Sequence, residues 1–214
     1  MWHLSYVAIG AALAPRLDWP VLGLALLAFL LAMGIGAHAL DELNGRPLGT
    51  GIGDRTLVAL AAISIAAAAG IGIVVALDRT LWLLAFVAFG AFVVVAYNLE
   101  LFGGRFHTDI WFGLAWGAFP VLTASFAVAE RLRLDAVIAA AFATLLSLAQ
   151  RVLSTPVRTV RRRVEAVHGA IEYRDGRTQP IDTRTLTRPA ERALQLLTAA
   201  TVALAAALVV SHLV

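Results

Sequence analysis

The stretch that decides the fold is residues 20–44, PVLGLALLAFLLAMGIGAHALDELN. Residues 20–37 contain no charged side chain, and an apolar run of this length is typical of a helix that crosses the hydrocarbon of a bilayer. The run then ends in a group of polar side chains, namely His38, Asp41, Glu42 and Asn44. His38, Asp41 and Glu42 stand at i, i+3 and i+4, so a helix would place them on one face. Because ionisable groups are costly beside hydrocarbon, their clustering there indicates a functional site.

The composition of the whole chain is that of an integral membrane protein. Of the 214 residues, 60% are hydrophobic and 14% are charged, whereas soluble domains are roughly a quarter charged. There is no Cys, which excludes disulfides and thiolate metal sites. All 17 basic residues counted as Lys and Arg are Arg, and they gather beside the apolar runs. This placement favours contacts with anionic lipid headgroups and no binding of nucleic acid.

Apolar runs predict about seven transmembrane helices in a single all-α membrane domain, residues 1–214. They lie near residues 3–15, 20–40, 56–77, 81–98, 108–129, 133–153 and 190–213. One side of the predicted bundle receives Arg46, Arg55, Arg105, Arg158, Arg161, Arg162, Arg163, Arg174, Arg177, Arg184 and Arg188, and the other receives Arg16, Arg79, Arg131 and Arg133. The positive-inside rule then places the N-terminus and the His38 cluster on the cytoplasmic side. We therefore expect an integral protein of the cytoplasmic membrane of a prokaryote, with its active-site side facing the cytoplasm.

The longest polar connection, residues 154–189, is expected to be a basic cytoplasmic loop. A basic helix over residues 158–167 would lie on anionic headgroups. Residues 170–181 would form a small hairpin around an Asp175-Gly176 turn. The last helix would then begin with Thr187 as its cap and Pro189 in its first turn.

Three polar groups end apolar runs on this predicted cytoplasmic side and would line a common mouth. They are His38, Asp41, Glu42, Asn44 and Arg46; Tyr97, Asn98, Glu100, Arg105, His107 and Asp109; and Gln150, Arg151, Ser154 and Thr155. Carboxylates suit Mg²⁺, and carboxylates mixed with imidazoles suit Zn²⁺ or iron. Arg105 and Arg151 would suit a phosphate or diphosphate. A plainer interpretation stays open, in which these charges meet water at helix ends and His38 hydrogen-bonds Asp41 or Glu42.

The order of the motifs resembles that of the UbiA superfamily of intramembrane prenyltransferases, over roughly residues 2–153. The resemblance begins at Trp2-His3-Leu4 and continues with Leu17-Asp18-Trp19-Pro20-Val21-Leu22, Ala37-His38-Ala39-Leu40-Asp41-Glu42-Leu43-Asn44-Gly45, Ala96-Tyr97-Asn98-Leu99-Glu100, and Gly113-Leu114-Ala115-Trp116-Gly117-Ala118-Phe119-Pro120. The chain departs from the family where further carboxylates are expected, because Gly45 and Gly49 replace two of them and residues 150–156 contain none.

The resemblance implies a helical bundle around a lipid-filled cavity, with Mg²⁺ and a prenyl diphosphate held at the cytoplasmic side. It implies roles for named residues: Asp41, Glu42 and Asn44 in catalysis, His38, Asp41 and Glu42 at the metal, and Arg46, Tyr97, Asn98, Arg105 and Arg151 at the substrate. The leading hypothesis is thus a metal-dependent prenyltransferase acting on an isoprenoid diphosphate or related lipid. The alternatives are a non-catalytic membrane subunit or lipid-binding protein with a membrane-protein partner, and a lipid hydrolase or oxidase with Zn²⁺ or iron.

Overall fold

The computed structural model describes residues 2–213 as a bundle of helices with one two-stranded hairpin. Five helices are long and apolar enough to cross a membrane, and two shorter apolar helices accompany them. The five are Trp19–Leu43, Asp54–Asp78, Asp109–Ala129, Leu134–Arg163 and Thr183–Val210, and the shorter two are His3–Ala12 and Leu83–Asn98. The prediction of an all-helical membrane bundle is confirmed in this form.

Two of the long helices contain π-helical segments in their middle. The first runs through α2 (Trp19–Phe29), η1 (Leu30–Gly36) and α3 (Ala37–Leu43), and the second through α7 (Asp109–Gly113), η2 (Leu114–Ala118) and α8 (Phe119–Ala129). The other elements are α1 (His3–Ala12), α4 (Asp54–Asp78), α5 (Leu83–Asn98), α6 (Leu101–Gly104), α9 (Leu134–Arg163), β1 (Ala170–Glu172), β2 (Thr178–Pro180) and α10 (Thr183–Val210).

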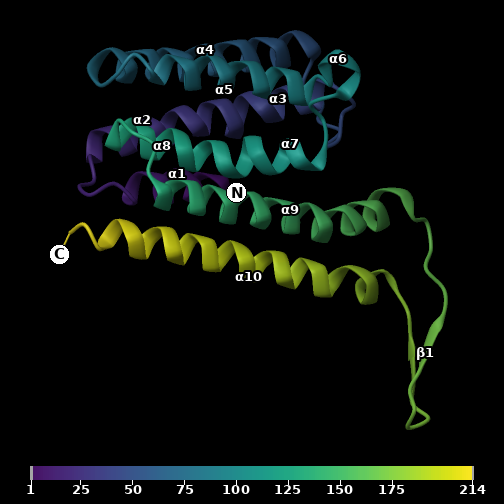
Figure 1. Cartoon of the computed structure of the whole chain (residues 1–214). Helices are drawn as coiled ribbons and strands as arrows, with labels where there is room; N and C mark the ends of the chain where they lie inside the picture. The colour runs from purple at the N-terminus through teal and green to yellow at the C-terminus, as the bar shows by residue number, and fades with distance from the viewer. Residues whose placement is uncertain (1, 214) are drawn as a thin grey trace.

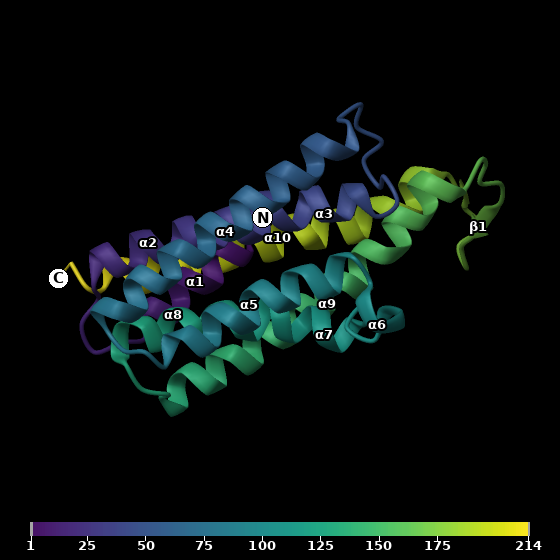
Figure 2. The ribbon, with the colours of Figure 1, turned by 90° about the horizontal axis from the view of Figure 1, so that it is seen from above.

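The helices lie side by side in layers (Figure 1). The α4 and α5 pair covers one side of the bundle, the two π-containing helices lie beneath it, and α1, α9 and α10 follow. The view from above shows the same helices running nearly parallel, with β1 beyond the ends of α9 and α10 (Figure 2). The two π-containing helices therefore occupy the interior, where π segments often mark functional sites.

Polar residues at helix starts satisfy the first free N–H groups. Asp18 accepts from Val21 N at 3.0 Å before α2, and Thr108 accepts from Trp111 N at 3.3 Å before α7. Asp182 and Thr185 form a capping box before α10. Such caps fix where each helix begins.

The helices approach one another most closely at glycines. A Cβ atom on Gly10 of α1 would lie 2.2 Å from the backbone oxygen of Val121 in α8. A Cβ atom on Gly117 would lie 2.5 Å from the backbone oxygen of Ala143 in α9. Small residues at helix interfaces allow this backbone contact in membrane bundles.

The structure corrects the prediction for residues 154–189. The expected hairpin is present, with Ala170 paired to Pro180 and Glu172 to Thr178. However, α9 continues through Pro156 to Arg163, so the basic helix predicted over residues 158–167 is present as far as Arg163 as the end of α9. The last helix is capped by Asp182 and begins at Thr183, five residues before the start predicted from a Thr187 cap; Thr187 is buried inside the helix. The ion pair between Arg161 and Glu191, 2.5 Å, joins the two extended helix ends.

A pH-dependent contact lies at the opposite end of the bundle. Asp18 accepts from Val21 N and pairs with Arg79, and these two partners hold the pKa of its carboxyl below the usual value. A carboxyl with a lowered pKa stabilises the fold above its unfolded-state pKa of about 3.9, and this contribution is lost as pH falls through the folded-state pKa. We expect Asp18→Ala to lower stability by about 1 kcal/mol at neutral pH and to flatten the dependence of the unfolding midpoint on pH below about 4. Asp78→Asn is the matched control, since Asp78 also contacts Arg79, at 3.3 Å, but is 74% exposed. An equal effect of both variants would contradict this role of Asp18.

Candidate functional site

A polar hollow of about 350 Å³ opens between α1, α3, α5 and α9, at the end of the bundle where the hairpin lies. It brings together side chains from all three polar groups of the sequence. We call it the polar hollow; its polar and charged lining residues are His3, His38, Asp41, Tyr97, Asn98, His107, Gln150, Arg151, Ser154 and Arg158. The prediction of a common mouth thus corresponds to a cavity in the structure.

Arg151 organises one wall of the polar hollow. Its Nε lies 2.6 Å from Asp109 Oδ1, its Nη1 donates to the Tyr97 hydroxyl at 2.8 Å, and its guanidinium lies 5.1 Å from the centre of the Phe112 ring. The neighbouring Gln150 has a buried Oε1 without a hydrogen-bond partner within residues 2–213. This wall therefore combines fixed donors with one acceptor that is free to receive a hydrogen bond.

The first polar group is divided between the polar hollow and a loop. His38 and Asp41 line the hollow. Glu42 is buried, 3% exposed, and accepts from Leu48 N at 2.9 Å and from Thr50 N at 2.6 Å and Thr50 Oγ1 at 2.8 Å. Both oxygens of Glu42 are thus engaged by the loop between α3 and α4. Their i, i+3, i+4 spacing predicts one shared face, but His38 and Asp41 line the hollow whereas Glu42 contacts the loop.

The remaining predicted site residues have different surroundings. Asn98 lines the hollow and donates to Val94 O at 2.7 Å, and Asn44 donates to Asn98 O at 3.0 Å, which ties the end of α3 to the end of α5. Arg46 pairs with Asp54 and donates to Ile52 O at 2.6 Å, and Arg105 is exposed on the loop after α6. Arg46 and Arg105 do not line the polar hollow, so its cationic side chains are Arg151 and Arg158.

The ligand set for a metal is limited. Among residues 2–213, no three His, Asp or Glu side chains come together closely enough to hold a metal ion. Such a set is what a structural or catalytic Zn²⁺ or iron site needs. Mg²⁺ differs, because it is commonly bound by one or two carboxylates together with substrate phosphates. Asp41 is the carboxylate of the polar hollow that suits this arrangement.

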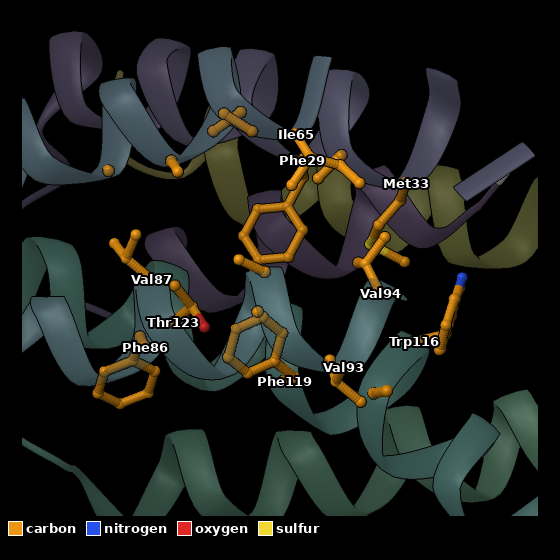
Figure 3. Close-up of a pocket in the computed structure, with 18 residues that line it drawn as sticks. Phe29, Met33, Ile65, Phe86, Val87, Val93, Val94, Trp116, Phe119 and Thr123 are labelled. Atoms are coloured by element: carbon orange, nitrogen blue, oxygen red, sulfur yellow. The ribbon is translucent and has the colours of Figure 1, made fainter. Parts of the chain in front are cut away.

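An apolar cavity of about 100 Å³ lies inside the bundle beside the polar hollow, and Figure 3 shows the side chains that line it. Its walls come from α2, η1, α4, α5, η2 and α8. Phe29, Met33 and Trp116 line both the polar hollow and the apolar cavity, so the two spaces adjoin at these side chains, and we call this place the junction. Phe86 and Phe119 lie farther along the cavity, where their rings face the same space (Figure 3).

Both π segments border this junction. Met33 belongs to η1, and Ala115 and Trp116 belong to η2. A π segment shifts the side chains that follow it relative to an α-helix, and such segments are frequent at functional sites. The positions of Met33 and Trp116 at the junction are therefore consistent with a site built between the two central helices.

Sequence reasoning missed His3 and the junction residues. His3 lines the polar hollow, and its Nδ1 donates to Trp116 O at 3.0 Å. Its signal in the sequence is a lone imidazole in an otherwise apolar segment, residues 3–14. Phe29, Met33 and Trp116 carry no signal that separates them from core residues.

No family model, characterised protein or solved structure matches this chain. The resemblance to the UbiA superfamily therefore rests on the motifs of the sequence and stays a prediction.

Proposed function

We propose that the protein is a membrane enzyme that binds an isoprenoid diphosphate or a related anionic lipid and transfers its prenyl group, as the resemblance to the UbiA superfamily implies. The observation that supports this proposal is that the polar hollow and the apolar cavity lie side by side and share the side chains of Phe29, Met33 and Trp116. An amphiphilic molecule needs a polar and an apolar compartment in contact, and its head and tail meet where the compartments meet.

The two compartments differ in the chemistry that they offer. Arg151 and Arg158 supply guanidinium groups for a diphosphate, and charge-assisted hydrogen bonds of this kind stabilise the negative charge of a leaving group. The apolar cavity of about 100 Å³ is smaller than the cavity of about 150 Å³ that takes up benzene, so it suits roughly one isoprene unit. The site therefore favours a substrate whose first isoprene unit lies in the cavity.

Asp41 would hold a Mg²⁺ that enters with the substrate phosphates. Bound there, Mg²⁺ would neutralise charge on the departing diphosphate. His38 lines the hollow near Asp41, and Asn44 with Asn98 fixes the helix ends around it. Glu42 supports this arrangement through the loop that it holds.

The arginine distribution supports a cytoplasmic position for the polar hollow, in a prokaryotic cytoplasmic membrane. We propose seven crossings, with α1 and α5 completing the bundle of five long helices. The exposed arginines at the ends of α9 and α10, such as Arg162 and Arg184, would contact anionic lipid headgroups.

The proposal is tested with a whole ligand and its two halves. In detergent with Mg²⁺, geranyl diphosphate is expected to bind at least about 100-fold more tightly than inorganic diphosphate or geraniol, because only the whole molecule fills both compartments. Ala69→Leu fills the apolar cavity and should lower the affinity for geranyl diphosphate about tenfold, while the affinity for inorganic diphosphate stays unchanged. Ala66→Leu on the lipid-exposed side of the same helix is the control. Equal affinities for the whole ligand and either half would reject the two-compartment site.

One observation favours the non-catalytic alternative, in which the protein binds lipid without turnover. The ion pair between Arg151 and Asp109 partly neutralises the guanidinium that would meet the diphosphate. Tight binding of geranyl diphosphate without release of diphosphate would identify this second function.

A further inference from the structure

The ring of His3 is held by a hydrogen bond to a backbone carbonyl of another helix. Nδ1 of His3 lies 3.0 Å from the backbone oxygen of Trp116, which belongs to the π-helical segment η2. A carbonyl oxygen only accepts hydrogen bonds, so the proton of the imidazole must be on Nδ1. In the neutral ring, Nε2 is then a lone-pair acceptor.

The ring of His3 is fixed in orientation as well as in tautomer. It packs edge-to-face against Tyr6 and Phe112, with ring centres 5.8 Å and 5.9 Å away. Such packing limits rotation of the side chain, so Nε2 keeps one direction. A preoriented acceptor of this kind is what proton transfer requires.

His3 stands beside the junction of the two compartments, because its partner Trp116 lines both of them. In a bound isoprenoid diphosphate, the bond between head and tail would lie at this junction. The charged side chains of α9 that line the hollow, Arg151 and Arg158, are hydrogen-bond donors, whereas Nε2 of His3 is a hydrogen-bond acceptor. The titratable and charged groups around it in the hollow and its packing shell are Tyr6, His38, Asp41, Tyr97, His107, Arg151 and Arg158.

We propose that His3 is the proton acceptor of the site, whose Nε2 takes the proton of a hydroxyl-bearing second substrate as that hydroxyl attacks the prenyl carbon. The inference rests on the proposed function. The carbon–oxygen bond to the diphosphate breaks and its electron pair leaves with the diphosphate oxygen. A bond forms between the prenyl carbon and the attacking oxygen, and the hydroxyl proton moves to Nε2 of His3. Water is the simplest such substrate and gives the prenyl alcohol.

His107 is the nearest competitor for this role. Its Nδ1 also donates to a backbone carbonyl, that of Tyr97 at 2.9 Å, and its ring lies 4.5 Å from the Tyr97 ring. Like His3, it lines the polar hollow and not the apolar cavity, but its carbonyl partner Tyr97 lines only the hollow, whereas Trp116, the partner of His3, lines both spaces. The structure therefore assigns proton transfer to His3.

The test uses His3→Asn in the full-length protein, with geranyl diphosphate, Mg²⁺ and water. The amide nitrogen of Asn takes the place of Nδ1 and keeps a donor for Trp116 O, while Nε2 is removed. We expect release of diphosphate to slow about 10²- to 10³-fold and to lose its pH dependence, with binding of geranyl diphosphate unchanged. His212→Asn is the matched control, because His212 also bonds a backbone oxygen, Ala12 O at 2.7 Å, near the other end of α1.

Two results of this rate measurement would overturn the proposal: a rate that His3→Asn leaves intact, and the same loss in His107→Asn instead of His3→Asn. A wild-type protein that binds geranyl diphosphate without releasing diphosphate would reject the proposed prenyl transfer itself. Spectra of ¹⁵N-histidine-labelled protein need no substrate: Nε2 of His3 is expected to be unprotonated at pH 7, and a protonated Nε2 also overturns the proposal. Failure of the wild type to bind geranyl diphosphate would instead reject the proposed function, and the spectra would then decide the state of His3.

Discussion

Gly10→Ala is expected to destabilise the protein by about 3 kcal/mol or more, the upper end of the cost of overpacking. The added Cβ would lie 2.2 Å from Val121 O and 2.8 Å from Val121 Cα. These are backbone atoms in α8, so no change of rotamer relieves the contact. The whole of α1 would have to move away from α8, and His3 and Tyr6, on the same helix, would move with it. The measurement is the unfolding midpoint in detergent, followed by the yield of folded protein.

Gly23→Ala is the matched control for this prediction. A Cβ on Gly23 meets no atom within 4 Å, so the variant should be as stable as the wild type or slightly more stable, since alanine favours helix. A similar loss of stability in both variants would mean that helix propensity, and not the contact between α1 and α8, limits these positions. If Gly10→Ala were as stable as the wild type, this result would contradict the close backbone contact between α1 and α8 at Gly10.

The sequence was sufficient to predict the class of fold and the end of the bundle where the polar hollow lies. Apolar runs predict membrane helices because the bilayer requires long stretches of hydrocarbon side chains, and the polar residues that end them gather around the polar hollow. The hairpin was predictable as well, because an Asp-Gly pair favours a tight turn. These features depend on residues that are close in sequence.

The sequence was not sufficient where a role depends on distant partners. Spacing places Glu42 with His38 and Asp41, yet the loop at Leu48 and Thr50 takes both of its oxygens. His3 lines the polar hollow and bonds the backbone oxygen of Trp116, which lies 113 residues away along the chain. The junction between the compartments likewise depends on two π segments, and no local pattern in these apolar sequences distinguishes them from α-helix.

Substitutions of the adjacent acids Asp41 and Glu42 are expected to give different defects. Glu42→Gln replaces one acceptor oxygen with an NH₂ group, which cannot accept from the backbone amides of the loop. Hydrogen exchange at Leu48 and Thr50 should then speed up by about tenfold or more, because their backbone N–H groups lose a charged hydrogen-bond partner. Asp41→Asn leaves the loop intact, since Asp41 lines the polar hollow instead.

Binding of geranyl diphosphate measured with and without Mg²⁺ separates the two roles. Asp41→Asn should abolish the gain in affinity that Mg²⁺ brings, while hydrogen exchange in the loop stays as in the wild type. Glu42→Gln should retain a Mg²⁺-dependent gain, reduced only as far as the loosened loop disturbs the end of α3. The opposite pattern, in which Glu42→Gln loses the Mg²⁺ dependence and keeps a protected loop, would restore Glu42 as a metal ligand. The adjacent acids would then act together, as their neighbouring positions in the sequence first indicated, and the loop hydrogen bonds would be the lesser part of what Glu42 does.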